Sequence, residues 1–166
     1  MFCRSIARCM KLNIKGTDKK NAELFGEFTR KHLHLTECYT SLKSLKKNPP
    51  ELDAYISGSD QVWNPSFSFI NKHYFLDFTP DNAKRISYAA SIGIPVNSPK
   101  LNKSVFEKYI PKFDNISLRE KTHIPFVSQF TDKDVCSVLD PTLLLKSDDY
   151  DELCKDASYP DGDYLF

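Results

Sequence analysis

Apolar and polar positions alternate with two different periods along the chain, and each change of period predicts a change of secondary structure. In residues 21–33 the apolar positions recur every three or four residues, which predicts a helix with Thr17 or Asp18 as its N-cap. A second, short helix is predicted over residues 41–47. It ends at residues 48–50 (Asn-Pro-Pro), because proline cannot continue a helix.

Short apolar runs bounded by glycine or proline predict strands. They cover residues 53–57, 74–78, 85–91, 115–118 and 135–139. Further helices are predicted over residues 101–110, within 120–130 and over 148–155, the last capped by Ser147 or Asp148. Strands that alternate with helices indicate βαβ units, so we expect an α/β fold with a Rossmann-like, mostly parallel sheet and flanking helices on both faces.

The 166 residues suit one ordinary domain. We expect residues 1–20 to be a poorly defined N-terminal segment and residues 21–158 to form the α/β domain. Residues 159–162 predict a turn, and 163–166 begin another strand. The last residues, 159–166, are therefore interpreted as the start of a second domain that this chain does not include, and the chain as a truncated copy.

Composition excludes several classes of partner and compartment. The 23 basic and 22 acidic residues give a net charge of +1, so nothing in the charge favours nucleic acid. No apolar run approaches the roughly 20 residues that span a bilayer, so no transmembrane segment is expected. The five cysteines include no C-x-x-C pair, which favours free thiols, a reducing cytoplasmic location and no metal site. The oligomeric state is left open.

Ligands of open parallel sheets bind beyond the carboxyl ends of the strands. After the first predicted strand, Gly58 permits a close backbone approach, and Ser59, Asp60 and Gln61 offer a hydroxyl, a carboxylate and an amide. That set suits the vicinal hydroxyls of a sugar. The alternative, slightly favoured by composition alone, is that the side chains of Asp60 and Asn64 only hydrogen-bond to the backbone of the turn while Trp63 fills the core.

Three later strand ends carry further candidates. Arg119 and Glu120 follow one strand, where the guanidinium either grips a carboxylate or phosphate or forms an ordinary surface pair, the second being somewhat favoured. Ser91 and Gly93 form either a ligand-admitting loop or a simple strand exit. Asp140, before Pro141, is interpreted mainly as a helix N-cap. No dinucleotide, P-loop or serine-hydrolase motif is present.

Several segments together resemble one family. They are Tyr55-Ile56-Ser57-Gly58-Ser59-Asp60-Gln61-Val62-Trp63-Asn64-Pro65, Tyr74-Phe75-Leu76-Asp77-Phe78, Arg85-Ile86-Ser87-Tyr88-Ala89-Ala90-Ser91-Ile92-Gly93, Ile116-Ser117-Leu118-Arg119-Glu120 and Leu139-Asp140-Pro141-Thr142-Leu143-Leu144-Leu145. In this order they are similar to the polysaccharide pyruvyl transferases, over about residues 25–145. The G-S-D-Q-V-W-N-P run is the specific part.

The resemblance implies the N-terminal half of a two-domain, GT-B-like fold in exopolysaccharide or other surface polysaccharide biosynthesis. It also implies transfer of a pyruvyl group from phosphoenolpyruvate, with no other cofactor, onto two hydroxyls of a saccharide or lipid-linked saccharide, leaving a ketal. Under this hypothesis Arg119 binds the anion and Asp60 contacts or activates a saccharide hydroxyl. Ser59, Gln61 and Ser91 position substrate, and Gly58, Asn64, Gly93 and Glu120 complete the predicted site.

The sequence also departs from the family pattern. Nothing before Asn21 resembles the strand and loop with which family members usually begin. The resemblance also implies a second domain that supplies a histidine and basic residues, and we expect residues 1–166 to lack it. We therefore expect residues 1–166 alone to show no transferase activity. The alternatives are a nucleotide-sugar glycosyltransferase of the same architecture and a non-catalytic saccharide-binding remnant.

Overall fold

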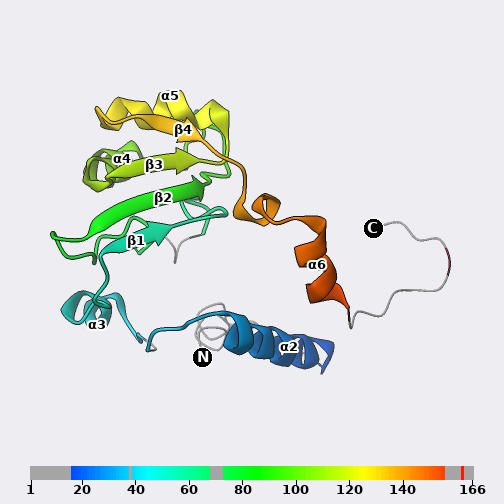
Figure 1. Ribbon diagram of the computed structural model, residues 1–166. Helices are drawn as coiled ribbons and strands as arrows, with labels where there is room; N and C mark the ends of the chain where they lie inside the picture. Colours follow the sequence, from blue (N-terminus) through cyan, green and yellow to red (C-terminus); the bar gives the residue numbers. More distant parts are fainter. Residues whose placement is uncertain (1–15, 38, 68–72, 156–161, 163–166) are drawn as a thin grey trace.

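A computed structural model describes residues 16–37, 39–67, 73–155 and 162, with the side chains of 16–21 left out. Figure 1 shows four strands whose arrows point the same way, with helices around them. The strands are β1 (Ala54–Ser57), β2 (Lys84–Ala90), β3 (Asn115–Leu118) and β4 (Val135–Ser137). The α-helices are α2 (Gly16–His32), α3 (Leu42–Lys47), α4 (Lys103–Tyr109), α5 (Ile124–Val127) and α6 (Ser147–Cys154). Short 3-10 helices are η1 (Ile110–Lys112), η2 (Lys121–His123), η3 (Ser128–Phe130) and η4 (Pro141–Leu144).

The sheet is entirely parallel, with the strands in chain order β1-β2-β3-β4, which confirms the predicted Rossmann-like α/β class. Connections between parallel strands are almost always right-handed. With the strands in chain order, this rule places all three connections on the same face of the sheet. Burial agrees, since Tyr55 of β1 and Leu118 of β3 are buried while Ile56 is 63% exposed and Cys136 is exposed. Helices on both faces, as expected from sequence, are therefore not found in the described part of the chain.

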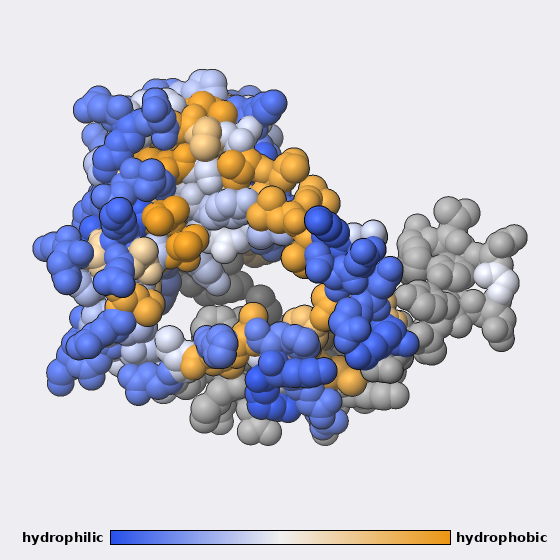
Figure 2. Space-filling model, in the orientation of Figure 1, coloured by the Kyte–Doolittle hydropathy of each residue, from blue (hydrophilic) through white to orange (hydrophobic). Residues whose placement is uncertain are grey.

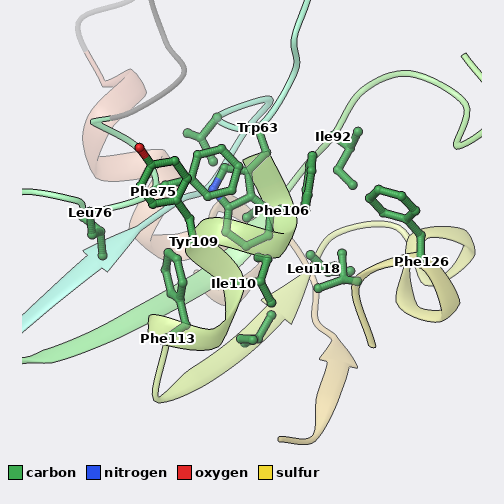
Figure 3. Packing of buried hydrophobic residues seen from close by; sticks show 14 of the residues in the cluster. Trp63, Phe75, Leu76, Ile92, Phe106, Tyr109, Ile110, Phe113, Leu118 and Phe126 are labelled. Atoms are coloured by element: carbon green, nitrogen blue, oxygen red, sulfur yellow. The ribbon is translucent and has the colours of Figure 1, made fainter. Parts of the chain in front are cut away.

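One aromatic cluster fills the covered face (Figure 3). It takes Trp63 and Phe75 from the β1–β2 connection, Phe106 from α4 and Phe126 from α5. The Trp63 and Phe75 rings stack at 5.2 Å, and Phe106 meets both edge-on. Aromatic pairs of this geometry add stability beyond the area they bury. All three crossovers thus pack against the sheet through one core, which holds the carboxyl ends of the strands in place.

Residues 74–78 do not form the predicted strand. They are a series of turns in which Leu76 N–H donates to the His73 carbonyl and Thr79 N–H to that of Leu76. A strand would alternate its side chains between two faces, whereas Phe75 and Leu76, neighbours in sequence, are 1% and 5% exposed. Burial of both against the core favours the turn, with Leu76 at φ 54°.

The other elements differ from expectation mainly at their ends. Helix α2 begins at Gly16, so Thr17 and Asp18 lie inside it and do not cap it. Helix α3 is capped by Ser41 as its predicted start implies, and β4 stops at Ser137, two residues early. The strand expected over residues 163–166 and most of the turn before it lie outside the described residues.

Leucines between β4 and α6 are exposed to solvent. Leu139, Leu143, Leu144 and Leu145 are 50–65% exposed, and Figure 2 shows orange atoms where Figure 1 draws this connection. Helix α2 also exposes apolar side chains, with Phe25 at 66%. No described helix has the length and apolar content to cross a bilayer.

Candidate active site

The turn after β1 is fastened to the end of β2 by backbone hydrogen bonds. Ser91 N–H donates to the Asp60 carbonyl at 2.9 Å, and Trp63 N–H donates to the Ser91 carbonyl at 3.1 Å. Gly58 has φ 131°, and a Cβ there would lie 1.9 Å from the carbonyl oxygen of Tyr88 in β2. Only glycine fits so close a backbone approach, and this approach brings Asp60, at φ 74°, to the carboxyl edge of the sheet.

Arg119 follows β3 and stands at the centre of the polar groups on this edge. Its guanidinium lies 3.4 Å from oxygens of Asp60, Glu120 and Asp140. Partial burial opposes the charged form, but the hydrogen bond and charge of Glu120, followed by Asp140 and Asp60, outweigh it and raise the pKa of Arg119. The three carboxylates come from three strand ends, so Arg119 links the turns after β1, β3 and β4.

Asp140 caps η4, as predicted. Its side chain accepts from Thr142 N–H at 3.1 Å and from the Thr142 hydroxyl at 2.8 Å. These two hydrogen bonds, a third from Ser59 and one from Arg119 overcome the effect of burial and lower the pKa of Asp140 to about 2. Asp140 is therefore a firmly ionised member of the site as well as a cap, and it brings Ser59 into the cluster.

Glu120 joins the ends of β2 and β3. The Ser91 hydroxyl, fully buried, donates to Glu120 Oε1 at 2.7 Å. The other oxygen, Oε2, lies 3.5 Å from Nδ1 of His123 in η2. His123 is 7% exposed, and its Nε2 lies 2.9 Å from the carbonyl oxygen of Ile94. Ser91, Glu120 and His123 thus form a connected line of polar groups beside Arg119.

This line forms one wall of an open cavity of about 560 Å³. Its polar lining comes from residues after β1, β2 and β3, which include Gln61, Ser91, Glu120, Thr122 and His123. Gly93, also in the lining, has φ 66°, and a Cβ there would lie 2.5 Å from Gln61 Oε1. The cavity volume falls within the range of sites for small organic ligands. Within the described residues, no group of three or more His, Cys, Asp or Glu side chains is placed to hold a metal ion.

Two residues of the G-S-D-Q-V-W-N-P run face the protein interior. Trp63 is 2% exposed, and its Nε1 donates to the Tyr74 carbonyl at 3.1 Å. Asn64 is 4% exposed, accepts from Ser66 N–H and donates to Gln61 Oε1 at 2.5 Å. The geometry therefore supports the interpretation that Trp63 fills the core and Asn64 stabilises the turn. Asn64 does not line the cavity itself but holds the side chain of Gln61, which does.

The structure brings together most of the residues that the sequence singles out. Ser59, Asp60, Ser91, Arg119 and Glu120 meet at the carboxyl edge through the contacts given above. His123 was not singled out from the sequence. Its position could have indicated a role, because it lies four residues after Arg119 in the segment that directly follows β3.

Parallel topology defines an α/β protein, and the polar cluster at the carboxyl edge of the sheet is the candidate for a small-molecule site of the open-sheet kind. The polysaccharide pyruvyl transferase family model matches residues 6–165, nearly the whole chain. This chain belongs to the polysaccharide pyruvyl transferase family. The match extends beyond residues 25–145 at both ends, so it includes residues 6–20, a stretch in which the sequence by itself shows no resemblance to the start of family members.

Searches of curated proteins and of solved structures found no match. The assignment to the family therefore rests on the family model. That model indicates a transferase that pyruvylates a polysaccharide and so acts on a saccharide acceptor.

Proposed function

We propose that this chain takes part in the transfer of a pyruvyl group from phosphoenolpyruvate to a pair of saccharide hydroxyls, with formation of a ketal and release of phosphate, in surface polysaccharide biosynthesis. The observation that carries the proposal is the cluster in which Arg119 meets Asp60, Glu120 and Asp140 beside the cavity. Family membership supplies the reaction class.

The cluster offers the groups that this reaction needs. A guanidinium can hold a carboxylate or a phosphate through two parallel hydrogen bonds. The contact between Arg119 and Asp60 is long, at 3.4 Å, and the Asp60 side chain is 81% exposed. Such an exposed pair is weak. Asp60 is free to turn to a saccharide hydroxyl while Arg119 exchanges that contact for the anion.

The neighbouring residues are suited to positioning. Gln61, held by Asn64, presents an amide to the cavity, and the hydroxyl of Ser59 sits beside Asp140. A cytoplasmic setting is part of the proposal. The described free thiols, Cys136 and Cys154, are exposed, and exposed thiols persist in reducing compartments.

Ligand-dependent thermal unfolding of the purified chain tests the proposal. A ligand that binds the folded state raises the melting temperature by mass action. We expect phosphoenolpyruvate to do so, and a panel of methyl hexopyranosides to include a second stabilising ligand. Arg119→Gln should abolish the effect of phosphoenolpyruvate, and Asp60→Asn the effect of the glycoside. Lys121→Gln, which removes an exposed charge two residues from Arg119, is the matched control.

Three results separate the readings. Stabilisation by a nucleotide sugar but not by phosphoenolpyruvate would replace the proposal with a glycosyltransferase. Glycoside binding alone would favour a saccharide-binding module. Equal losses in the Arg119→Gln and Lys121→Gln variants would show that charge in general, and not this site, attracts the anion.

A further inference from the structure

Two buried polar atoms without hydrogen-bond partners face each other at the cavity wall. They are Oε2 of Glu120 and Nδ1 of His123, 3.5 Å apart. Buried polar groups in native proteins are almost always paired, so two orphans in contact call for a physical cause. Both belong to side chains that line the cavity.

The protonation of His123 follows from its other nitrogen. Nε2 lies 2.9 Å from the Ile94 carbonyl oxygen, which can only accept, so Nε2 carries a hydrogen. In a neutral ring Nδ1 is then a lone pair, and it faces a carboxylate oxygen that is also an acceptor. The arrangement becomes attractive only when a proton lies on Nδ1 or on Oε2.

The remaining contacts of Glu120 leave Oε2 to the imidazole. Its Oε1 accepts from the Ser91 hydroxyl at 2.7 Å and faces Arg119 Nε at 3.4 Å. Ser91 belongs to the end of β2 and Arg119 to the end of β3, while the Ile94 loop presents an uncharged carbonyl. Among the described residues, Arg119 is the charged group that faces the pair, and it contacts the oxygen away from His123.

We propose that Glu120 and His123 share one proton, and that Glu120, 32% exposed at the cavity wall, donates it to the bound substrate while His123 is the positioning residue that holds it. This role rests on the proposed pyruvyl transfer. There the proton forms a C–H bond at C3 of phosphoenolpyruvate, and the electrons of the C2–C3 double bond move into that bond. One acceptor hydroxyl oxygen then bonds to C2, and its proton returns to the Glu120–His123 pair. The second hydroxyl displaces phosphate from C2, and its proton leaves with the phosphate.

Nitrogen NMR of the histidine rings tests the shared proton without any turnover. The chain, labelled with ¹⁵N-histidine, contains His32, His34, His73 and His123, and a His123→Asn variant assigns the signal. We expect the Nδ1 signal of His123 to show the shared proton, either as a hydrogen on Nδ1 itself or as a strong hydrogen bond from Glu120 to Nδ1. Glu120→Gln should change this signal and leave those of His32 and His34 unchanged.

A neutral His123 whose Nδ1 signal is the same in wild type and in Glu120→Gln would overturn the shared proton and leave His123 a structural brace. Should Glu120→Gln fail to fold, Glu120→Asp provides a second test. Its shorter side chain keeps the carboxylate but moves it away from Nδ1, so the Nδ1 signal of His123 should change in this variant too.

Turnover by the enzyme with its acceptor tests proton donation. Glu120→Gln should slow it by about 100-fold or more, the usual range for loss of a general acid. His123→Asn should slow it less and displace one limb of the pH profile, while Lys121→Gln leaves the rate and the profile unchanged. A rate in Glu120→Gln equal to that of wild type would overturn the donor role. Absence of turnover by residues 1–166 alone is already expected and bears on neither point. If the NMR result is as expected but phosphoenolpyruvate fails to raise the melting temperature of the wild-type chain, pyruvyl transfer is contradicted and the shared proton is not.

Discussion

The Ser91 hydroxyl donates a 2.7 Å hydrogen bond to Glu120 Oε1, and this contact joins the end of β2 to the end of β3 at the wall of the cavity. Ser91 is completely buried, and its backbone also holds the turn after β1. One residue therefore couples three strand ends.

Ser91→Ala should destabilise the chain by about 1–3 kcal/mol, because Glu120 Oε1 loses its shortest hydrogen bond inside the protein. Denaturant unfolding measures the change. Ser104→Ala, on the exposed side of α4, is the control and should alter the free energy of unfolding by no more than about 0.5 kcal/mol. Equal effects of the two substitutions would mean that the Ser91 contact adds nothing to stability.

Gly58→Ala should cost about 2–4 kcal/mol or prevent folding. The new Cβ would meet the Tyr88 carbonyl oxygen at 1.9 Å, backbone that cannot move aside without disturbing β2. Gly26→Ala in α2 provides a contrast, since its Cβ would meet only the flexible end of Arg30, at 3.3 Å, and alanine favours helix by about 1 kcal/mol. Circular dichroism through thermal unfolding should give opposite signs, and a tolerated Gly58→Ala would refute the close approach.

Phe75→Ala should destabilise the core by about 3–5 kcal/mol, the range for removing a buried aromatic ring. Phe75 is 1% exposed and stacks on Trp63, the one tryptophan of the sequence, so tryptophan fluorescence reports both folding and the loss of the partner. The matched control is Phe25→Ala, which removes the same ring from a site 66% exposed and should change stability little. Similar losses in both variants would contradict the assignment of the core.

Asp140 should give stability a dependence on acid pH. Its pKa is about 2 in the folded chain, below the roughly 3.9 of an unfolded aspartate, so its contribution is complete above about pH 5 and is lost as the pH falls towards 2. Asp140→Asn keeps a capping side chain but cannot titrate. The difference in unfolding free energy between wild type and Asp140→Asn should therefore shrink from about pH 5 to about pH 2. A difference that stays constant over this range would contradict the lowered pKa.

Much of the fold follows from local sequence because its strands are bounded by strong turn signals. Residues 115–118 form β3 as predicted, between the Pro111 helix end and the turn at Glu120. Residues 74–78 carry the same apolar signature, yet their hydrogen bonds close into turns because Phe75 and Leu76 are both buried against the core. Periodicity over five residues does not distinguish these two outcomes.

The candidate site was predictable to the extent that parallel strands end at one edge. That rule brings Asp60, Ser91 and Arg119 together without knowledge of the side-chain contacts. The contact between His123 and the Ile94 carbonyl spans 29 residues and depends on how η2 meets the loop after β2. No local pattern encodes such a contact. The strand-end rule also places Asp140 at the edge where Arg119 lies, but it does not show which carboxylates contact the guanidinium.

The exposed leucines between β4 and α6 affect how unfolding experiments on this chain are interpreted. Dyes that brighten in apolar surroundings bind such surface, and Leu139, Leu143, Leu144 and Leu145 present it while the sheet and its core are intact. A bright dye signal before any heating is thus a property of the native chain and not a sign of a molten globule. Loss of near-ultraviolet dichroism from the Trp63 cluster is the criterion that distinguishes the two states.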